Sequence, residues 1–123
     1  MTAWTDEELD AIGEAAELEL APARSDGTLR DPVTIWVVRH GDALYIRSWR
    51  GPAGRWYRAV LDTRRGHVRC GGVDSDVRLV DFDDDTDDAV DAAYRRKYPG
   101  DRYLASMVRP EARATTLELV AQR

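Results

Sequence analysis

The chain has 123 residues, of which 43% are hydrophobic, and its formal net charge is −5. This length suits one domain with one core, and no run of about 18 apolar residues is present that could cross a membrane. One cysteine and two histidines provide neither an internal disulfide nor a metal-ligand cluster of familiar spacing. We therefore expect residues 1–123 to form a single domain of a cytoplasmic protein, without a membrane anchor or a structural metal.

Charge is unevenly distributed along this acidic chain. Residues 1–22 carry seven acids and no base, whereas residues 47–69 carry seven arginines and one acid. Nucleic-acid-binding domains are usually basic overall, so the pattern argues against nucleic acid as a partner. It favours a local site for a small anion in the arginine-rich segment.

The first third of the chain predicts a helix followed by strands. Thr5 and Glu8 have the spacing of a capping box, which starts a helix over residues 5–17. Residues 17–21 alternate in polarity and predict a short strand before Pro22. The segment Val33 to Arg39 is apolar on both alternating faces, which is typical of a central strand covered on two sides.

The middle of the chain predicts a hairpin and then a short helix. Gly41-Asp42 forms a tight turn, and Ala43 to Trp49 alternates cleanly as the returning strand. A Gly-Pro break over residues 51–54 precedes Arg55 to Leu61, whose apolar residues recur at helical spacing.

The last part predicts a second hairpin, a helix and a final strand. His67 to Cys70 and Val77 to Phe82 are strands joined across a Gly-Gly pair, and Cys70 is expected to be a buried small hydrophobe. A helix begins after Thr86 and ends at Tyr98, with acids in its first turn and bases in its last. A helical turn over 103–108 and a strand over 113–120 complete the chain.

The resemblance to known proteins rests on short segments spread along the chain: Ile35 to Val38, Leu44 to Ser48, Gly54 to Arg58, Tyr94 to Tyr98 and Ala114 to Leu117. In these segments the chain resembles the DUF2255 family of uncharacterised bacterial proteins. The order of elements resembles the split β-barrel of flavin-binding proteins. The resemblance implies an α+β fold with a six-stranded antiparallel split β-barrel and flanking helices.

A more distant similarity involves the segment from Ile46 to Tyr57, which resembles the deazaflavin-dependent nitroreductases. In those proteins a strand ends in a turn that contacts cofactor phosphate, and a Trp-Tyr pair opens a helix. The chain departs from that pattern, because Trp49-Arg50 and Pro52 replace the expected lysine and second glycine, and an expected asparagine after Trp56-Tyr57 is absent. The similarity implies FMN or a deazaflavin as cofactor at the interface of a homodimer, with binding of no cofactor as the alternative.

The expected site combines guanidinium groups for an anion with aromatic rings for a planar ligand. Its cofactor-binding residues are Arg47, Ser48, Trp49, Arg50, Trp56, Tyr57 and Arg58. The competing interpretation is a solvated strand edge whose arginines pair with the acidic helices. Trp36 is assigned to core packing, because its strand is apolar on both faces.

Three functions stay open at this point. The first is a flavin- or deazaflavin-dependent oxidoreductase that binds a planar anionic small molecule. The second is a cofactor-free cyclase or isomerase that uses the same pocket, with Arg47, Tyr45 or Tyr98 as its polar groups and the two tyrosines as the candidate catalytic residues. It predicts an enclosed apolar cavity that is too small for a flavin. The third is a non-catalytic binding protein. The acidic run from Asp81 to Asp91 lacks the glycine and glutamate of an EF-type loop, so no calcium site is predicted.

Overall fold

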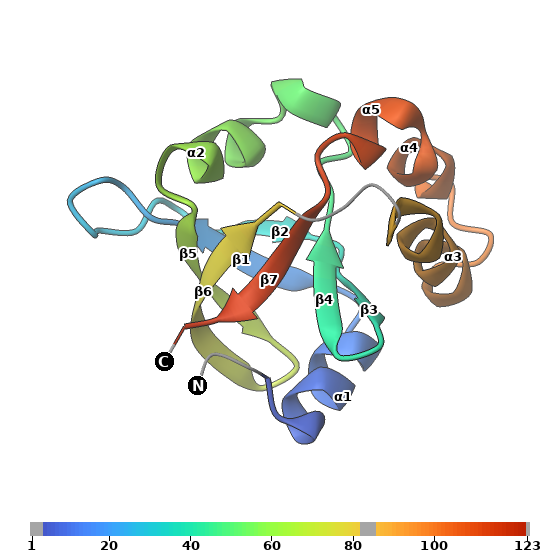
Figure 1. Cartoon of the computed structure of the whole chain (residues 1–123), viewed down its shortest axis with the longest axis horizontal. Coiled ribbons are helices and arrows are strands. Elements are labelled where there is room, and N and C mark those ends of the chain that lie inside the picture. Colours follow the sequence, from blue (N-terminus) through green and yellow to red (C-terminus); the bar gives the residue numbers. More distant parts are fainter. Residues whose placement is uncertain (1–3, 82–85, 123) are drawn as a thin grey trace.

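The protein is described here by a computed structural model, which covers residues 4–81 and 86–122. One antiparallel sheet of seven strands, in the order β2-β1-β5-β6-β7-β4-β3, curls into a partial barrel (Figure 1). The strands are β1 (Leu18–Pro22), β2 (Val33–Ile35), β3 (Val38–His40), β4 (Ala43–Ile46), β5 (Arg65–Cys70), β6 (Val73–Val80) and β7 (Leu117–Ala121). The helices are α1 (Asp6–Glu14), the short 3-10 helix η1 (Gly51–Ala53), α2 (Arg55–Thr63), α3 (Asp87–Lys97), α4 (Leu104–Val108) and α5 (Pro110–Arg113).

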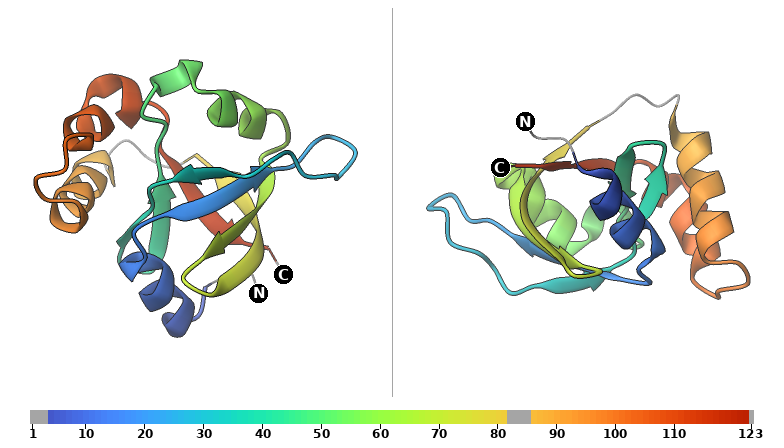
Figure 2. Two further views of the ribbon diagram at one scale, coloured as in Figure 1. Left: turned by 180° about the vertical axis from the view of Figure 1, so that it is seen from behind. Right: turned by 90° about the horizontal axis from the view of Figure 1, so that it is seen from below.

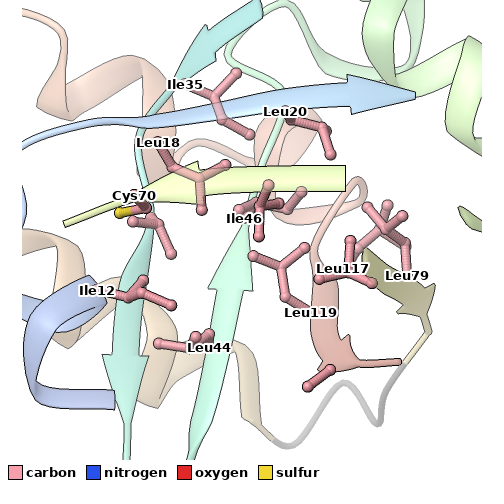
Figure 3. Packing of buried hydrophobic residues seen from close by; sticks show 14 of the residues in the cluster. Ile12, Leu18, Leu20, Ile35, Leu44, Ile46, Cys70, Leu79, Leu117 and Leu119 are labelled. Carbon is pink, nitrogen blue, oxygen red and sulfur yellow. The ribbon is translucent and has the colours of Figure 1, made fainter. Parts of the chain in front are cut away.

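The barrel interior holds the main hydrophobic core. Side chains from α1, β1, β2, β4, β5, β6 and β7 point toward one another inside the curled sheet (Figure 3). Helix α1 contributes Leu9 and Ile12 to this core, and the predicted capping box at Thr5 and Glu8 is present. The helix ends at Glu14, three residues earlier than predicted, because Ala15 already has an extended backbone.

The segment predicted as a central strand, Val33 to Arg39, forms two edge strands instead. β2 and β3 lie at opposite edges of the sheet, and only Trp36 and Val37 connect them. A two-residue connection between opposite edges requires the sheet to curl until those edges meet. The segment is apolar on both faces because Ile35 and Val37 join the interior core whereas Val38 packs beneath α3. This division also raises the number of strands from the predicted six to seven.

The remaining predicted elements are confirmed with shifted ends. β4 stops at Ile46 rather than Trp49, and β5 and β6 form the predicted hairpin across a Gly-Gly turn. Phe82, the predicted end of β6, lies outside the described residues. Helix α3 has the predicted acidic first turn and basic last turn, although Thr86 makes no side-chain capping bond. Arg113, the first residue of the predicted last strand, is the last residue of α5 instead, and β7 begins only at Leu117, after a turn.

The helices cover the open parts of the sheet. α1 and α2 lie near opposite ends of the barrel, and α3 and α4 lie together on its outer side (Figures 1 and 2). A second hydrophobic cluster fills the space beneath α3 and α4, built on Val38, Tyr45 and Tyr94. No helix in the described part of the chain is long and apolar enough to span a membrane.

Candidate functional site

The candidate site begins where β4 ends, in the arginine-rich segment. The Ser48 amide donates a hydrogen bond to Thr115 Oγ1 at 2.8 Å, and the Gly51 amide returns to the Ser48 carbonyl at 2.9 Å. Gly51 has a φ of +68°, which favours glycine, and the chain then turns into η1 and α2. A Cβ atom on Gly54 would clash with Ser48 Oγ, so a larger residue there would require the Ser48 hydroxyl to move.

Two cavities adjoin at this turn and share Trp49 and Trp56. The first has a volume of about 330 Å³ and a mainly apolar lining. It is lined by Glu17, Thr34, Ile35, Trp36, Arg47, Trp49, Trp56, Tyr103 and Met107. The second has a volume of about 390 Å³ and is lined by Val33, Ser48, Trp49, Arg50, Gly54, Arg55 and Trp56. We call the two together the Trp49–Trp56 groove.

The apolar half of the groove is built from aromatic rings. Trp36 lies face to face with Tyr98, with ring centroids 3.8 Å apart and planes 4° apart. Trp49 and Tyr103 lie 6.1 Å apart and are 47% and 46% exposed, so this cavity opens to solvent at its rim. Exposed aromatic side chains beside an apolar cavity provide the surface on which a planar ligand can stack.

The other half of the groove is cationic. The Arg50 guanidinium lies 5.3 Å from the centre of the Trp49 ring, and Arg55 opens helix α2 beside it. Neither arginine pairs with an acidic residue in the described part of the chain. Arg109 donates to the Trp49 carbonyl at 2.9 Å and so ties the groove to α5. These two unpaired guanidinium groups are suited to a phosphate or carboxylate.

Arg47 has a different environment from Arg50. Its side chain is fully buried, and all five N–H groups have protein acceptors. It pairs with Asp91 at 2.5 Å and Asp87 at 3.2 Å, and it also donates to Thr116 Oγ1 at 2.8 Å and to the Met107 carbonyl at 3.0 Å. For Arg47 the structure therefore favours the ion-pair interpretation, since no donor is left for a phosphate.

The last two predicted cofactor ligands lie beyond the groove. Tyr57 packs partly against the main core, where burial raises the pKa of its phenol, and it lines neither cavity. Arg58 is exposed on α2 and has no acidic partner in the region described. Of the seven predicted residues, five line the groove: Arg47 in the first cavity, Ser48 and Arg50 in the second, and Trp49 and Trp56 in both.

The two candidate catalytic tyrosines also lie outside the groove. Tyr45 is buried beneath α3, and burial raises the pKa of its phenol. The Tyr98 hydroxyl donates to the Ala16 carbonyl at 2.7 Å, and its ring backs Trp36. Both tyrosines therefore support the packing around the barrel rather than the lining of either cavity.

Several residues of the groove were not predicted from sequence. Trp36 packs against the second cluster, as predicted, yet it also lines the apolar cavity. Tyr103 and Met107 reach the same cavity from the region of α4. The sequence around Tyr103 and Met107 gave no signal for this role. These residues reach the cavity only because α4 docks against it, and α4 lies more than 50 residues after Trp49 in the sequence.

The histidines and the cysteine lie away from the groove. His67 lies between Asp76 and Asp74 on the β5–β6 hairpin, and its hydrogen bond to Asp76 raises its pKa. His40 is exposed. Cys70 is buried, as predicted, and its thiol donates to the Glu17 carbonyl. Over residues 4–81 and 86–122 no group of three metal-ligating side chains converges; residues 82–85 of the acidic run lie outside these ranges.

Solved structures share this fold along nearly the whole chain. An F420 reductase is 18% identical with a TM-score of 0.56, covering 92% of this chain and 90% of its own. A conserved hypothetical protein from Mycobacterium tuberculosis is 13% identical with a TM-score of 0.65, covering 99% and 83%. An FAD-binding protein from Mesorhizobium loti is 14% identical with a TM-score of 0.57, covering 98% and 92%. At these identities the likeness establishes the α+β split-barrel fold.

Sequence comparison gives the family. No curated protein matches the chain significantly. A family model described as an uncharacterised protein conserved in bacteria matches residues 8–119, and so extends from α1 into β7. The chain therefore belongs to the DUF2255 family.

Proposed function

We propose that this protein binds a flavin-type cofactor, FMN or a deazaflavin, in the Trp49–Trp56 groove and serves as an oxidoreductase. The observation that carries the proposal is the division of one groove into an aromatic half and a cationic half. A flavin has the same division, since a planar ring system is joined to an anionic phosphate tail. The fold neighbours that bind F420 or FAD support the same class of ligand.

The chain's own residues have distinct roles in this proposal. Trp49, Trp56 and Trp36 would stack on or border the ring, and Arg50 and Arg55 would pair with the phosphate. Ser48 would contribute its hydroxyl at the closed turn. Any hydride transfer would be supplied by the cofactor, while the protein binds it, orients it and excludes water from one ring face.

The open rim of the groove bears on the alternatives. A cofactor-free cyclase or isomerase was expected to enclose a small apolar cavity, whereas Trp49 and Tyr103 leave this cavity open to solvent. A non-catalytic binding protein would use the same groove. It differs from the proposed oxidoreductase only in lacking turnover with a bound cofactor.

The test is a fluorescence titration of the purified protein with FMN and with F420. We expect saturable binding of one of them, and we expect Arg50→Gln and Trp49→Ala each to weaken it by about tenfold or more, since charge-assisted hydrogen bonds and stacking contribute about 1–3 kcal/mol each. Arg78→Gln is the matched control, because Arg78 is exposed on β6 and lines neither cavity. Absence of binding by both cofactors would refute the proposal.

The resemblance also implies a homodimer, and this stays a prediction. A partner subunit could cover the exposed rings of Trp49 and Tyr103, which border the groove. Light scattering coupled to size exclusion measures the mass directly, and a monomer at all concentrations would exclude a site completed by a partner.

A further inference from the structure

A separate cavity lies between α1, β3 and α3, and it shares no residue with the Trp49–Trp56 groove. Its volume is about 320 Å³. It is lined by Leu9, Asp10, Gly13, Glu14, Val38, Arg39, Ala93, Arg96 and Lys97. The inference drawn from it is therefore independent of the proposed cofactor site.

Lys97, the only lysine of the chain, is among the residues that line this cavity. Nζ donates to the Val37 carbonyl at 2.6 Å and more weakly to the Ile12 carbonyl at 3.5 Å. The side chain is half-buried, and no carboxylate in the described part of the chain lies within ion-pair distance of it. Nζ also lies 5.4 Å from the centre of the Tyr98 ring, a contact that favours the charged amine. Desolvation without a carboxylate partner acts in the opposite direction and destabilises the cation relative to its neutral form.

The reactivity of the amine follows from that environment. Burial lowers the pKa of Lys97 to about 8, against an opposing contribution from Cys70. At pH 7 a pKa near 8 leaves roughly a tenth of the amine neutral, whereas a solvated lysine is neutral to only about 0.03%. A neutral amine is the nucleophilic form, so Lys97 is activated in the way used by amines that form Schiff bases.

The charges around the cavity indicate which electrophile fits. Asp10 is paired with Arg39 at 2.6 Å, and Glu14 lies on the exposed side of α1. Arg96 has no acidic partner among the residues described, and it lines the same cavity as Lys97. A guanidinium beside a neutral amine can hold a carboxylate while the adjacent carbonyl carbon meets the nitrogen.

We propose that Lys97 captures small aldehydes that carry a carboxylate, of which glyoxylate is the simplest, as an imine in this cavity. The amine nitrogen attacks the aldehyde carbon, and the carbonyl oxygen leaves as water with the two hydrogens of the amine. A C=N bond replaces the C=O bond, and no oxidant or reductant takes part. Arg96 pairs with the carboxylate throughout.

The test uses the full-length protein, glyoxylate and cyanoborohydride at pH 7, with Nα-acetyl-lysine in the same tube as the reference amine. Peptide mapping by mass spectrometry separates Lys97 from the N-terminal amine. We expect Lys97 to be labelled at least about tenfold faster than the reference, in line with its larger neutral fraction. In denaturing urea this advantage should disappear, because it depends on the folded environment.

Propanal and the variant Arg96→Gln test the choice of ligand. Each rate of Lys97 labelling is divided by the rate of Nα-acetyl-lysine labelling with the same aldehyde. In the wild type this ratio should be severalfold larger for glyoxylate than for propanal. Arg96→Gln should abolish this preference. Labelling of Lys97 no faster than the reference amine would overturn the proposal. Lys97 would then have only a structural role, in linking α3 to α1 through its hydrogen bonds. Equal labelling by the two aldehydes would overturn the role of Arg96.

Discussion

At the residue scale, the largest fully buried side chain in the described part of the chain is that of Arg47, and it is charged. It joins the end of β4 to α3 through Asp87 and Asp91 and to α4 through the Met107 carbonyl. A buried guanidinium is tolerated only when every donor is satisfied, which is the case here. Arg47 and Met107 both line the groove, so the hydrogen bond between them holds this part of its wall in place.

Two acidic partners of Arg113 give a matched test of this buried network. Asp91 and Asp88 both accept from Arg113, but their side chains are 6% and 91% exposed, and only Asp91 also pairs with Arg47. We expect Asp91→Asn to lower the free energy of unfolding by about 3 kcal/mol or more, and Asp88→Asn by less than about 1 kcal/mol. Urea denaturation measures both; similar losses would show that burial of the Arg47 network does not matter.

The role of Arg47 could not be predicted from the sequence, and the reason is distance along the chain. Its partners Asp87, Asp91 and Thr116 lie 40, 44 and 69 residues away. A strand-end arginine in a cationic segment has the same local pattern whether it faces solvent, a ligand or a buried acid. Ser48, Trp49, Arg50 and Trp56 line one cavity, because they belong to one short segment that runs from the end of β4 through the Gly-Pro turn to the start of α2.

At the element scale, the sequence predicted α1, α2, α3, α4 and the two hairpins, but not α5 or the corner of the barrel. Val33 to Arg39 has one uninterrupted β pattern, and the break at Trp36-Val37 carries no glycine or proline to mark it. An apolar pattern on both faces is shared by a central strand and by two edge strands that meet at a corner. Only the pairing of β2 with β1 and of β3 with β4 distinguishes the two arrangements.

The turn of the β5–β6 hairpin provides a test at this scale. Gly71 and Gly72 have φ values of +57° and +85°, so alanine is strained at either position. A Cβ on Gly71 would lie 2.6 Å from the Ala11 carbonyl oxygen of α1, whereas a Cβ on Gly72 would meet nothing within 4 Å. The hairpin turn is therefore seated directly against α1.

Gly71→Ala and Gly72→Ala share the backbone strain and differ in the contact with α1. We expect both to destabilise the protein by about 1 kcal/mol through strain, and Gly71→Ala by a further 1–3 kcal/mol or so through the clash. Thermal unfolding compares the two directly. If Gly72→Ala lowered the stability more than Gly71→Ala, the close contact of the hairpin turn with α1 would be refuted.

At the scale of the whole molecule, groups that prefer to be neutral tie α3 to the barrel. The Lys97 amine and the Tyr98 hydroxyl both donate to backbone carbonyls near the Trp36-Val37 corner and the end of α1. Burial lowers the pKa of Lys97 to about 8 and raises the pKa of Tyr98, Tyr94 and Cys70. The packing of α3 against α1 and the two sheet edges should therefore make the free energy of unfolding depend on pH in the alkaline range.

The sign of that response follows from which state binds more protons. Between about pH 8 and pH 10.5 the unfolded lysine keeps a proton that the folded lysine has lost, so the free energy of unfolding rises with pH. Cys70 and the buried tyrosines act in the opposite direction. Their folded pKa values are raised, so their contribution is present below pH 9 for the thiol and pH 10 for the phenols and declines above.

Comparison with Lys97→Met separates the two effects, because the variant keeps Cys70 and the tyrosines and loses only the amine. The difference in unfolding free energy, wild type minus variant, should be constant below about pH 7 and should increase from pH 8 toward pH 10.5. Urea denaturation at closely spaced pH values measures this difference. A difference that stays flat over the whole range would mean that the folded amine titrates like a solvated lysine, and the activated amine proposed for the second cavity would be excluded with it.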